Sequence, residues 1–95
     1  MAIFKLSQKA KADLREIYRY GFFEFGELQA DQYFDQMFDW FEQIADAPMI
    51  YFAVSFAGDD YRRCVHGAHS IYFKVEQDGI LISRILGRQD TNEAL

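Results

Sequence analysis

The sequence predicts one α+β domain: a two-layer sandwich in which a helical hairpin packs on a mainly antiparallel sheet, in the order β-α-α-β-β-β. Between residues 8 and 47, apolar residues recur every three or four positions, which is typical of amphipathic helices. After Pro48 the pattern changes to alternation, which is typical of strands. The chain has 95 residues, the size of a single domain, so residues 1–95 are expected to form one unit.

The first half begins with a short strand, expected at residues 2–6, and Ser7 is placed to cap a helix that starts at Gln8. The apolar positions of that helix follow the helical period: Ala10, Leu14, Ile17, Tyr18, Gly21, Phe22 and Phe25. Gly26 then stands where a helix-ending residue with positive φ is favoured.

A second helix is expected from Glu27 to Ala47, where Pro48 ends it. Its apolar face consists of Ala30, Tyr33, Phe34, Met37, Phe41 and Ile44. Because one glycine separates the two helices, they are expected to fold back on each other as an antiparallel hairpin.

The second half reads as strands joined by tight turns. A weak strand is expected at 50–56 and stronger ones at 61–66, 69–76 and 80–86. The last is apolar on both faces, which predicts an interior position in the sheet. The polar tail, 88–95, is expected to end in a helical turn that begins at Thr91.

The composition predicts a cytoplasmic protein whose core needs no disulfide and no structural metal for stability. Ten Phe, six Tyr and one Trp can fill a core, since each ring buries about 150–250 Å². Cys64 is the lone cysteine, so no disulfide can form within the chain. No apolar run is long enough to span a bilayer, and the first residues do not resemble a signal peptide.

Charge is divided unevenly along the chain, whose net charge is −5. The second helix carries an acidic stripe with no Lys or Arg: Glu27, Asp31, Asp35, Asp39, Glu42 and Asp46. The ordinary interpretation of such a stripe is a solvated face. The alternative is a docking site for basic side chains of a partner, with Leu28 and Phe38 adding apolar contact at its edge.

Cations gather in the strand region, at Arg62, Arg63, Lys74, Arg84 and Arg88. In a strand, Arg62 and Arg63 face opposite ways, so at most one of them points toward the helices. Arg84 is the most unusual, because Ile82 and Leu86 are expected on its face of the interior strand. Its guanidinium therefore needs acceptors from this chain or from a partner.

Motifs for catalysis or metal binding are missing from the sequence. His66 and His69 flank the Gly67-Ala68 turn, but no Cys-x-x-Cys or His-Glu-x-x-His accompanies them. Ordinary hydrogen-bonded histidines are the expected interpretation. No phosphate-binding loop, nucleophile elbow or paired-carboxylate motif is present, so we predict no metal, no cofactor and no catalytic residue.

Nine short pieces in fixed order extend over nearly the whole chain: Leu6–Leu14, Ile17-Tyr18, Phe25–Ala30, Tyr33, Ile44-Ala45, Pro48, Tyr61-Arg62-Arg63, Gly67–Phe73 and Ile82–Asp90. Taken together, they resemble the ParE branch of the RelE/ParE toxin superfamily. The resemblance implies the toxin of a type II toxin–antitoxin pair, one that inhibits DNA gyrase and is neutralised by a ParD-like antitoxin.

The resemblance gives expectations for partner sites. We expect the antitoxin to cover the sheet at Arg62, Arg63, Tyr72, Lys74 and Arg84. For gyrase we expect the hairpin and the tail, with Phe38, Arg88, Asp90 and Leu95 as contacts. The toxin alone is not expected to bind nucleic acid sequence-specifically or to associate with a membrane, and its acidic net charge disfavours phosphate binding.

Two other functions stay open at this point. The RelE branch cleaves mRNA on the ribosome, and Arg63 and Arg84 match its arginines; its C-terminal tyrosine and its lysines have no counterparts here. The other is a non-toxic binding module with the same fold. Gly87 stands where many ParE-like sequences have His, so a function assigned to that position does not carry over.

Overall fold

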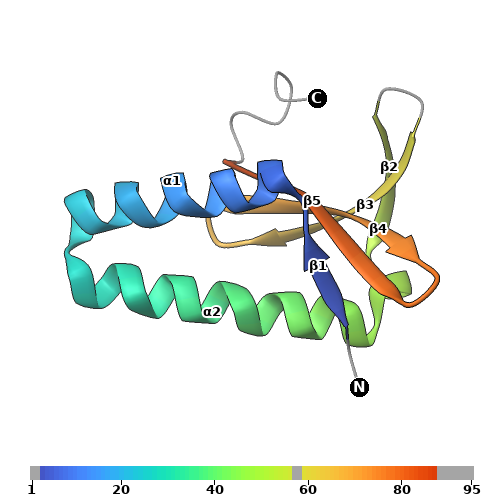
Figure 1. The fold of residues 1–95 in the computed structure, drawn as a ribbon, viewed down its shortest axis with the longest axis horizontal. Coiled ribbons are helices and arrows are strands. Elements are labelled where there is room, and N and C mark those ends of the chain that lie inside the picture. The colour runs from blue at the N-terminus through green and yellow to red at the C-terminus, as the bar shows by residue number, and fades with distance from the viewer. Residues whose placement is uncertain (1–2, 57–58, 88–95) are drawn as a thin grey trace.

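The computed structural model, which describes residues 3–56 and 59–87, is a helical hairpin packed on a five-stranded sheet (Figure 1). Its elements are β1 (Phe4–Leu6), α1 (Gln8–Phe25), α2 (Glu27–Asp46), the 3-10 turn η1 (Pro48–Ile50), β2 (Phe52–Phe56), β3 (Asp59–His66), β4 (His69–Glu76) and β5 (Gly79–Gly87). The predicted fold class is confirmed, but four strands follow the hairpin where the order β-α-α-β-β-β has three, because the weak strand expected at 50–56 is present as β2. No helix in this part of the chain is long and apolar enough to cross a bilayer.

The strands lie in the order β1-β5-β4-β3-β2. β1 pairs with β5 in parallel, and every other pairing is antiparallel. The predicted interior position of the last strand is confirmed, because β5 lies between β1 and β4. β2 forms the opposite edge, and it starts at Phe52 because Pro48–Ile50 turns as η1 instead of extending.

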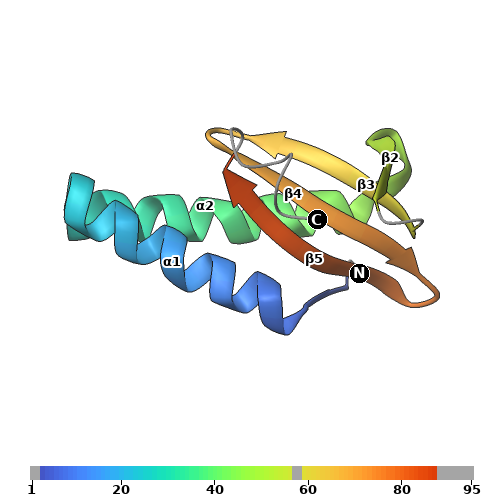
Figure 2. The same cartoon turned by 90° about the horizontal axis from the view of Figure 1, so that it is seen from above.

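Local signals set the hairpin as predicted. The Ser7 hydroxyl accepts a hydrogen bond from the Ala10 N–H at 3.0 Å and so caps α1. Gly26 ends α1 at φ 92°, a conformation that suits glycine. Figures 1 and 2 show α1 and α2 side by side, with their joined end extending beyond the strands. The predicted tail element, 88–95, lies outside the described residues.

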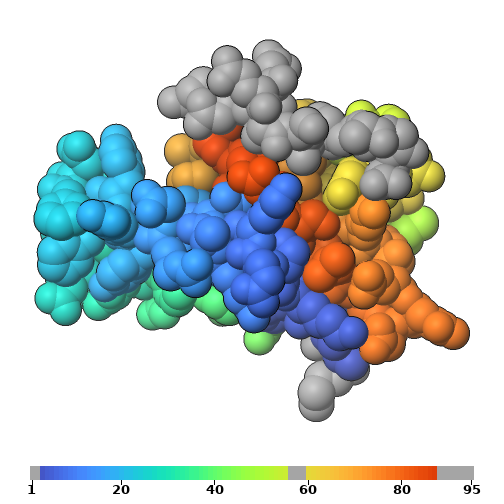
Figure 3. Space-filling model, turned by 45° about the horizontal axis from the view of Figure 1, so that its top comes forward, coloured from blue at the N-terminus to red at the C-terminus, as the bar shows by residue number. Residues whose placement is uncertain are grey.

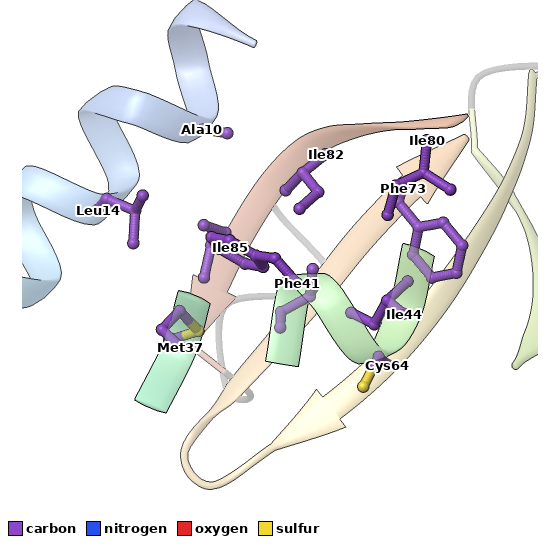
Figure 4. Close-up of a cluster of buried hydrophobic side chains, with 11 residues drawn as sticks. Ala10, Leu14, Met37, Phe41, Ile44, Cys64, Phe73, Ile80, Ile82 and Ile85 are labelled. Carbon is purple, nitrogen blue, oxygen red and sulfur yellow. The ribbon is translucent and has the colours of Figure 1, made fainter. Parts of the chain in front are cut away.

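The core fills the space between the hairpin and one face of the sheet (Figure 4). Leu14, Met37, Phe41 and Ile44 from the helices meet Cys64, Ile71, Phe73, Ile80, Ile82 and Ile85 from the strands. We call this face of the sheet the helix-facing side and the other the outer face. Figure 3 shows the hairpin at one end of the molecule and β4 and β5 toward the other.

Candidate functional site

The outer face of the sheet carries part of the predicted cationic surface. Arg63 is opposite Tyr72 in the β3–β4 register, and Tyr72 is opposite Arg84 in the β4–β5 register, so these three residues share the outer face. Arg63 is exposed. The Lys74 ammonium lies 4.8 Å from the centre of the Tyr61 ring, an arrangement in which the ring attracts the cation.

Arg62 points the other way. Its register partner is Phe73, a core residue, and its guanidinium donates to the Tyr51 carbonyl at 2.7 Å. The expectation that neighbouring arginines face opposite sides is therefore confirmed. The predicted five-residue antitoxin site is divided between the two sides of the sheet.

Arg84 finds its acceptors within the chain. Its guanidinium forms two hydrogen bonds with the Asp13 carboxylate of α1, at 2.9 and 3.1 Å. The same carboxylate accepts the Ile85 backbone N–H at 2.9 Å. This hydrogen bonding to Asp13 raises the pKa of Arg84 above its ordinary value. Both side chains are largely buried, with 21% and 15% of their surface exposed.

The expectation that Ile82 shares a face with Arg84 was wrong. A register shift between Tyr72 and Phe73 pairs Ile82 with Phe73 but Arg84 with Tyr72. Such a bulge inserts one residue and reverses the alternation beyond it. Ile82 thus lies in the core, while Arg84 lies on the outer face and reaches Asp13 at the margin of the sheet.

Two other predicted contact residues are less accessible than a contact site requires. Tyr72 is fully buried, so it offers no exposed area to an antitoxin in this structure. Phe38 is half-buried, with its ring between those of Phe4, Phe34 and Phe41, so much of its surface already contacts this chain. Arg88, Asp90 and Leu95, the other predicted gyrase contacts, lie outside the described residues.

The histidines form an aromatic cluster on the helix-facing side. The His66 ring is 4.1 Å from Trp40 and stacks on Tyr33 at 5.8 Å, while the Tyr33 hydroxyl is 2.7 Å from Nδ1 of His69. Burial lowers the pKa of both histidines. Among the described residues, no group of three or more His, Cys, Asp or Glu could hold a metal ion.

A groove between the helices was not predicted from the sequence. A cavity of about 360 Å³ opens between α1, α2 and the β3–β4 turn, and Ile17, Gly21, Tyr33, Ala68 and His69 are among the residues that line it. Three rings at the joined end of the helices, which we call the hairpin tip, are exposed: Tyr20, Phe23 and Phe25. Of these three, only Phe25 was predicted to lie on the apolar face of the first helix, and it is exposed because the sheet ends before the hairpin does.

Comparison with known proteins agrees with this architecture. Residues 4–91 match the family described as the ParE toxin of the type II toxin–antitoxin system parDE. The chain belongs to the ParE toxin family. Within that family, it is 33% identical over 75 residues to Toxin ParE1 of Caulobacter vibrioides, a match that covers 79% of this chain and 78% of the relative.

A solved structure shares the fold. The chromosomal ParDE toxin–antitoxin system from P. aeruginosa contains a chain that superposes with a TM-score of 0.76. The match covers 92% of this chain and 96% of that one at 21% sequence identity. The ParE fold accounts for the hairpin and the mixed, mostly antiparallel sheet described above.

Proposed function

We propose that this ParE toxin acts in the cytoplasm by binding DNA gyrase directly, without catalysis, and that a ParD-like antitoxin neutralises it. The non-catalytic part of the proposal is supported by the contacts of Arg84 and by the position of Arg63 relative to the histidines. An RNA-cleaving site needs free cations beside a group that transfers protons. Arg84 is already engaged by Asp13, and His66 and His69 lie on the side of the sheet opposite Arg63.

For the antitoxin we propose the outer face, where Arg63 is exposed and Lys74 is half-buried. An acidic antitoxin segment would find complementary charge there, which raises the association rate and selects the partner. Arg62 and Arg84 remain in the proposal as residues that support this surface, since each is already hydrogen-bonded within the chain.

For gyrase we propose the hairpin tip in place of Phe38. The side chains of Tyr20, Phe23 and Phe25 are 64%, 75% and 59% exposed. Exposed apolar rings that cluster at one end of a molecule are typical of a protein contact. Aromatic side chains of this kind also supply much of the binding energy at interfaces.

The test is a pair of assays with purified protein. We expect inhibition of gyrase supercoiling, accumulation of linear cleaved plasmid, and relief of both effects by the cognate antitoxin. Normal supercoiling together with cut mRNA on ribosomes would instead establish the RelE-like activity. The absence of both effects, with no growth arrest on expression, would leave a binding module without toxicity.

The hairpin tip has its own test. Phe23→Ser is expected to reduce gyrase inhibition by about tenfold or more. An aromatic ring that becomes buried against a partner contributes about 2 kcal/mol or more to the binding free energy. Antitoxin affinity should be retained. Ile50→Ser is the matched control, since Ile50 is equally exposed, at 75%, but lies on η1. Equal loss in both variants would contradict the tip assignment.

A further inference from the structure

The side of the hairpin that carries the acidic stripe also carries a continuous row of aromatic rings. Four of them, which we call the aromatic seam, come from both helices: Tyr18, Phe22, Phe34 and Phe38. Their ring centres are linked by separations of 6.3 Å for Tyr18–Phe22, 5.6 Å for Tyr18–Phe34 and 5.1 Å for Phe34–Phe38. None of the four is fully buried, and Phe22 is 41% exposed, so the seam lies at the surface.

Charges of opposite sign flank this seam. On α1, Lys11 and Arg15 precede Tyr18 and Phe22 at helical spacings of four, three and four, so these side chains share one face. On α2, Asp31, Asp35, Phe38 and Glu42 repeat the same spacings. A hydrogen bond of 2.6 Å from the Tyr18 hydroxyl to the Asp31 carboxylate places the two faces side by side.

Neither set of charges is neutralised within the described part of the chain. Lys11, Arg15 and Arg19, which we call the basic stripe, are all exposed, as are Asp31, Asp35 and Asp39. The ion pairs in that part are Lys5–Asp78 and Arg84–Asp13, which involve neither stripe. Like charges four residues apart destabilise a helix by about 0.2–0.5 kcal/mol per pair, so the acidic stripe gains from opposing cations.

We propose that this face is the interface of a twofold-symmetric dimer of this chain, in which the aromatic seams meet and the basic stripe of each copy lies over the acidic stripe of the other. The proposal does not depend on gyrase being the target. An apolar seam with charged flanks is the arrangement that pairs helices in bundles and coiled coils.

The charge pattern selects one of the two ways in which a twofold axis can join these faces. An axis across the helices would stack α1 on α1 and α2 on α2, so that like charges meet. An axis parallel to the helices stacks α1 of one copy on α2 of the other, so that opposite charges meet. Twofold symmetry then forms every favourable contact twice.

The levels of the residues also match in this arrangement. The ring contact between Tyr18 and Phe34 shows that these residues lie at the same height along the hairpin axis. The helices are antiparallel, so Arg15, three residues before Tyr18, lies at the height of Met37, three residues after Phe34. An axis parallel to the helices preserves these levels. Arg15 of one copy therefore falls between Asp35 and Asp39 of the other. Over most of its length the acidic stripe has a spacing of four residues, and the basic stripe of this chain has the same spacing. A second copy of the chain therefore supplies cations that match the acidic stripe.

The test measures the mass of the purified full-length chain by sedimentation and light scattering over a range of concentrations and salt. We expect a dimer that dissociates as salt is raised, because exposed charge pairs are screened. Arg15→Glu and Asp35→Lys are each expected to raise the dimer dissociation constant by about tenfold or more, since each puts like charges together twice.

A charge exchange makes the test specific. The double variant Arg15→Glu/Asp35→Lys restores opposite charges across the interface, so it should recover most of the lost affinity. A circular dichroism melt verifies that each variant is folded. Lys9→Glu/Glu16→Lys makes the same charge change at two exposed positions of α1 outside both stripes, so it should leave the mass unchanged.

Three results would overturn the proposal. The first is a monomer at all concentrations and salts. The second is a dimer that neither single reversal weakens, or that the double variant fails to restore. The third is that the single reversals leave the mass unchanged and weaken antitoxin binding instead, which would assign this face to the antitoxin.

Discussion

At the residue scale, Asp13 connects the helix layer to the strand that carries Arg84. β1 pairs with β5 only as far as Ile82, so beyond that point this edge of β5 has no neighbouring strand among the described residues. The Asp13 carboxylate fills this position by accepting the Ile85 N–H and two hydrogen bonds from Arg84. One side chain therefore satisfies a strand edge and a largely buried guanidinium together.

Asp13→Ala is expected to lower the free energy of unfolding by about 2–4 kcal/mol, because it removes two hydrogen bonds from the largely buried Arg84 charge and the acceptor of the Ile85 N–H. Urea denaturation measures the loss. Lys5→Ala is the control: its partner is Asp78, both side chains are more than half exposed, and such pairs contribute about 0–1 kcal/mol. Similar losses in the two variants would contradict this account of Asp13.

His66 is expected to make the stability of the fold depend on pH. Burial lowers its pKa below the ordinary value of 6.5, so the folded state binds its proton less readily than the unfolded chain. The free energy of unfolding is therefore unaffected by His66 above pH 6.5, where the side chain is neutral in both states. As the pH falls below 6.5 the unfolded chain takes up the proton first, and the free energy of unfolding decreases by at most about 1.4 kcal/mol per pH unit. Unfolding measured between pH 7.5 and 5 follows the change.

His66→Phe tests this assignment, because Nε2 of His66 is buried with no hydrogen-bond partner among the described residues. A ring of similar shape should be neutral or slightly stabilising at pH 7.5 and should reduce the pH dependence. His69→Phe should instead destabilise by about 1 kcal/mol at pH 7.5, because it removes the side-chain partner of the Tyr33 hydroxyl. An unchanged pH dependence in His66→Phe would disprove the His66 assignment.

At the scale of elements, the position of β1 depends on Gly79, the first residue of β5. Gly79 has φ 155°, and a Cβ placed there would lie 2.4 Å from the Ile3 carbonyl oxygen, which accepts the Ile80 N–H. Gly79→Ala is expected to lower the unfolding free energy by about 1–3 kcal/mol through backbone strain and displacement of β1.

Gly26→Ala is the matched control for Gly79→Ala. Gly26 also has a positive φ, 92°, but no atom lies within 4 Å of its Cβ position, so only the backbone term remains. Thermal unfolding of the two variants should show the larger loss for Gly79→Ala. The reverse order would mean that β1 tolerates the displacement.

The sequence predicted these elements well because each depends on local signals. The helical period, Ser7 and Gly26 set the hairpin, and alternation set the strands. The face on which Arg84 lies was not predicted correctly, because the bulge before Arg84 arises from strand pairing. No residue in Ile82-Ser83-Arg84 indicates a bulge in the sequence. The groove was missed for a similar reason, since it depends on where the sheet ends beside the helices.

At the scale of the whole molecule, the proposed antitoxin surface is separate from the other two contacts. Arg63 lies on the outer face of the sheet, whereas the hairpin tip and the aromatic seam both lie on the helices. The tip and the seam adjoin each other, since the ring centres of Phe22 and Phe23 are 5.7 Å apart. Changes at Arg63 should therefore leave binding at the tip and the seam intact, because distant, independent sites are usually additive in free energy.

Arg63→Ala tests this separation and the antitoxin surface. The side chain is exposed, so its loss should leave the melting temperature nearly unchanged while it weakens binding of the cognate antitoxin by several-fold. Calorimetry at two salt concentrations measures the affinity, and the difference from the unmodified chain should shrink at high salt. Gyrase inhibition by free Arg63→Ala should be unchanged. If gyrase inhibition fell with antitoxin affinity, both partners would have to use the outer face; an unchanged antitoxin affinity would remove Arg63 from the proposed site.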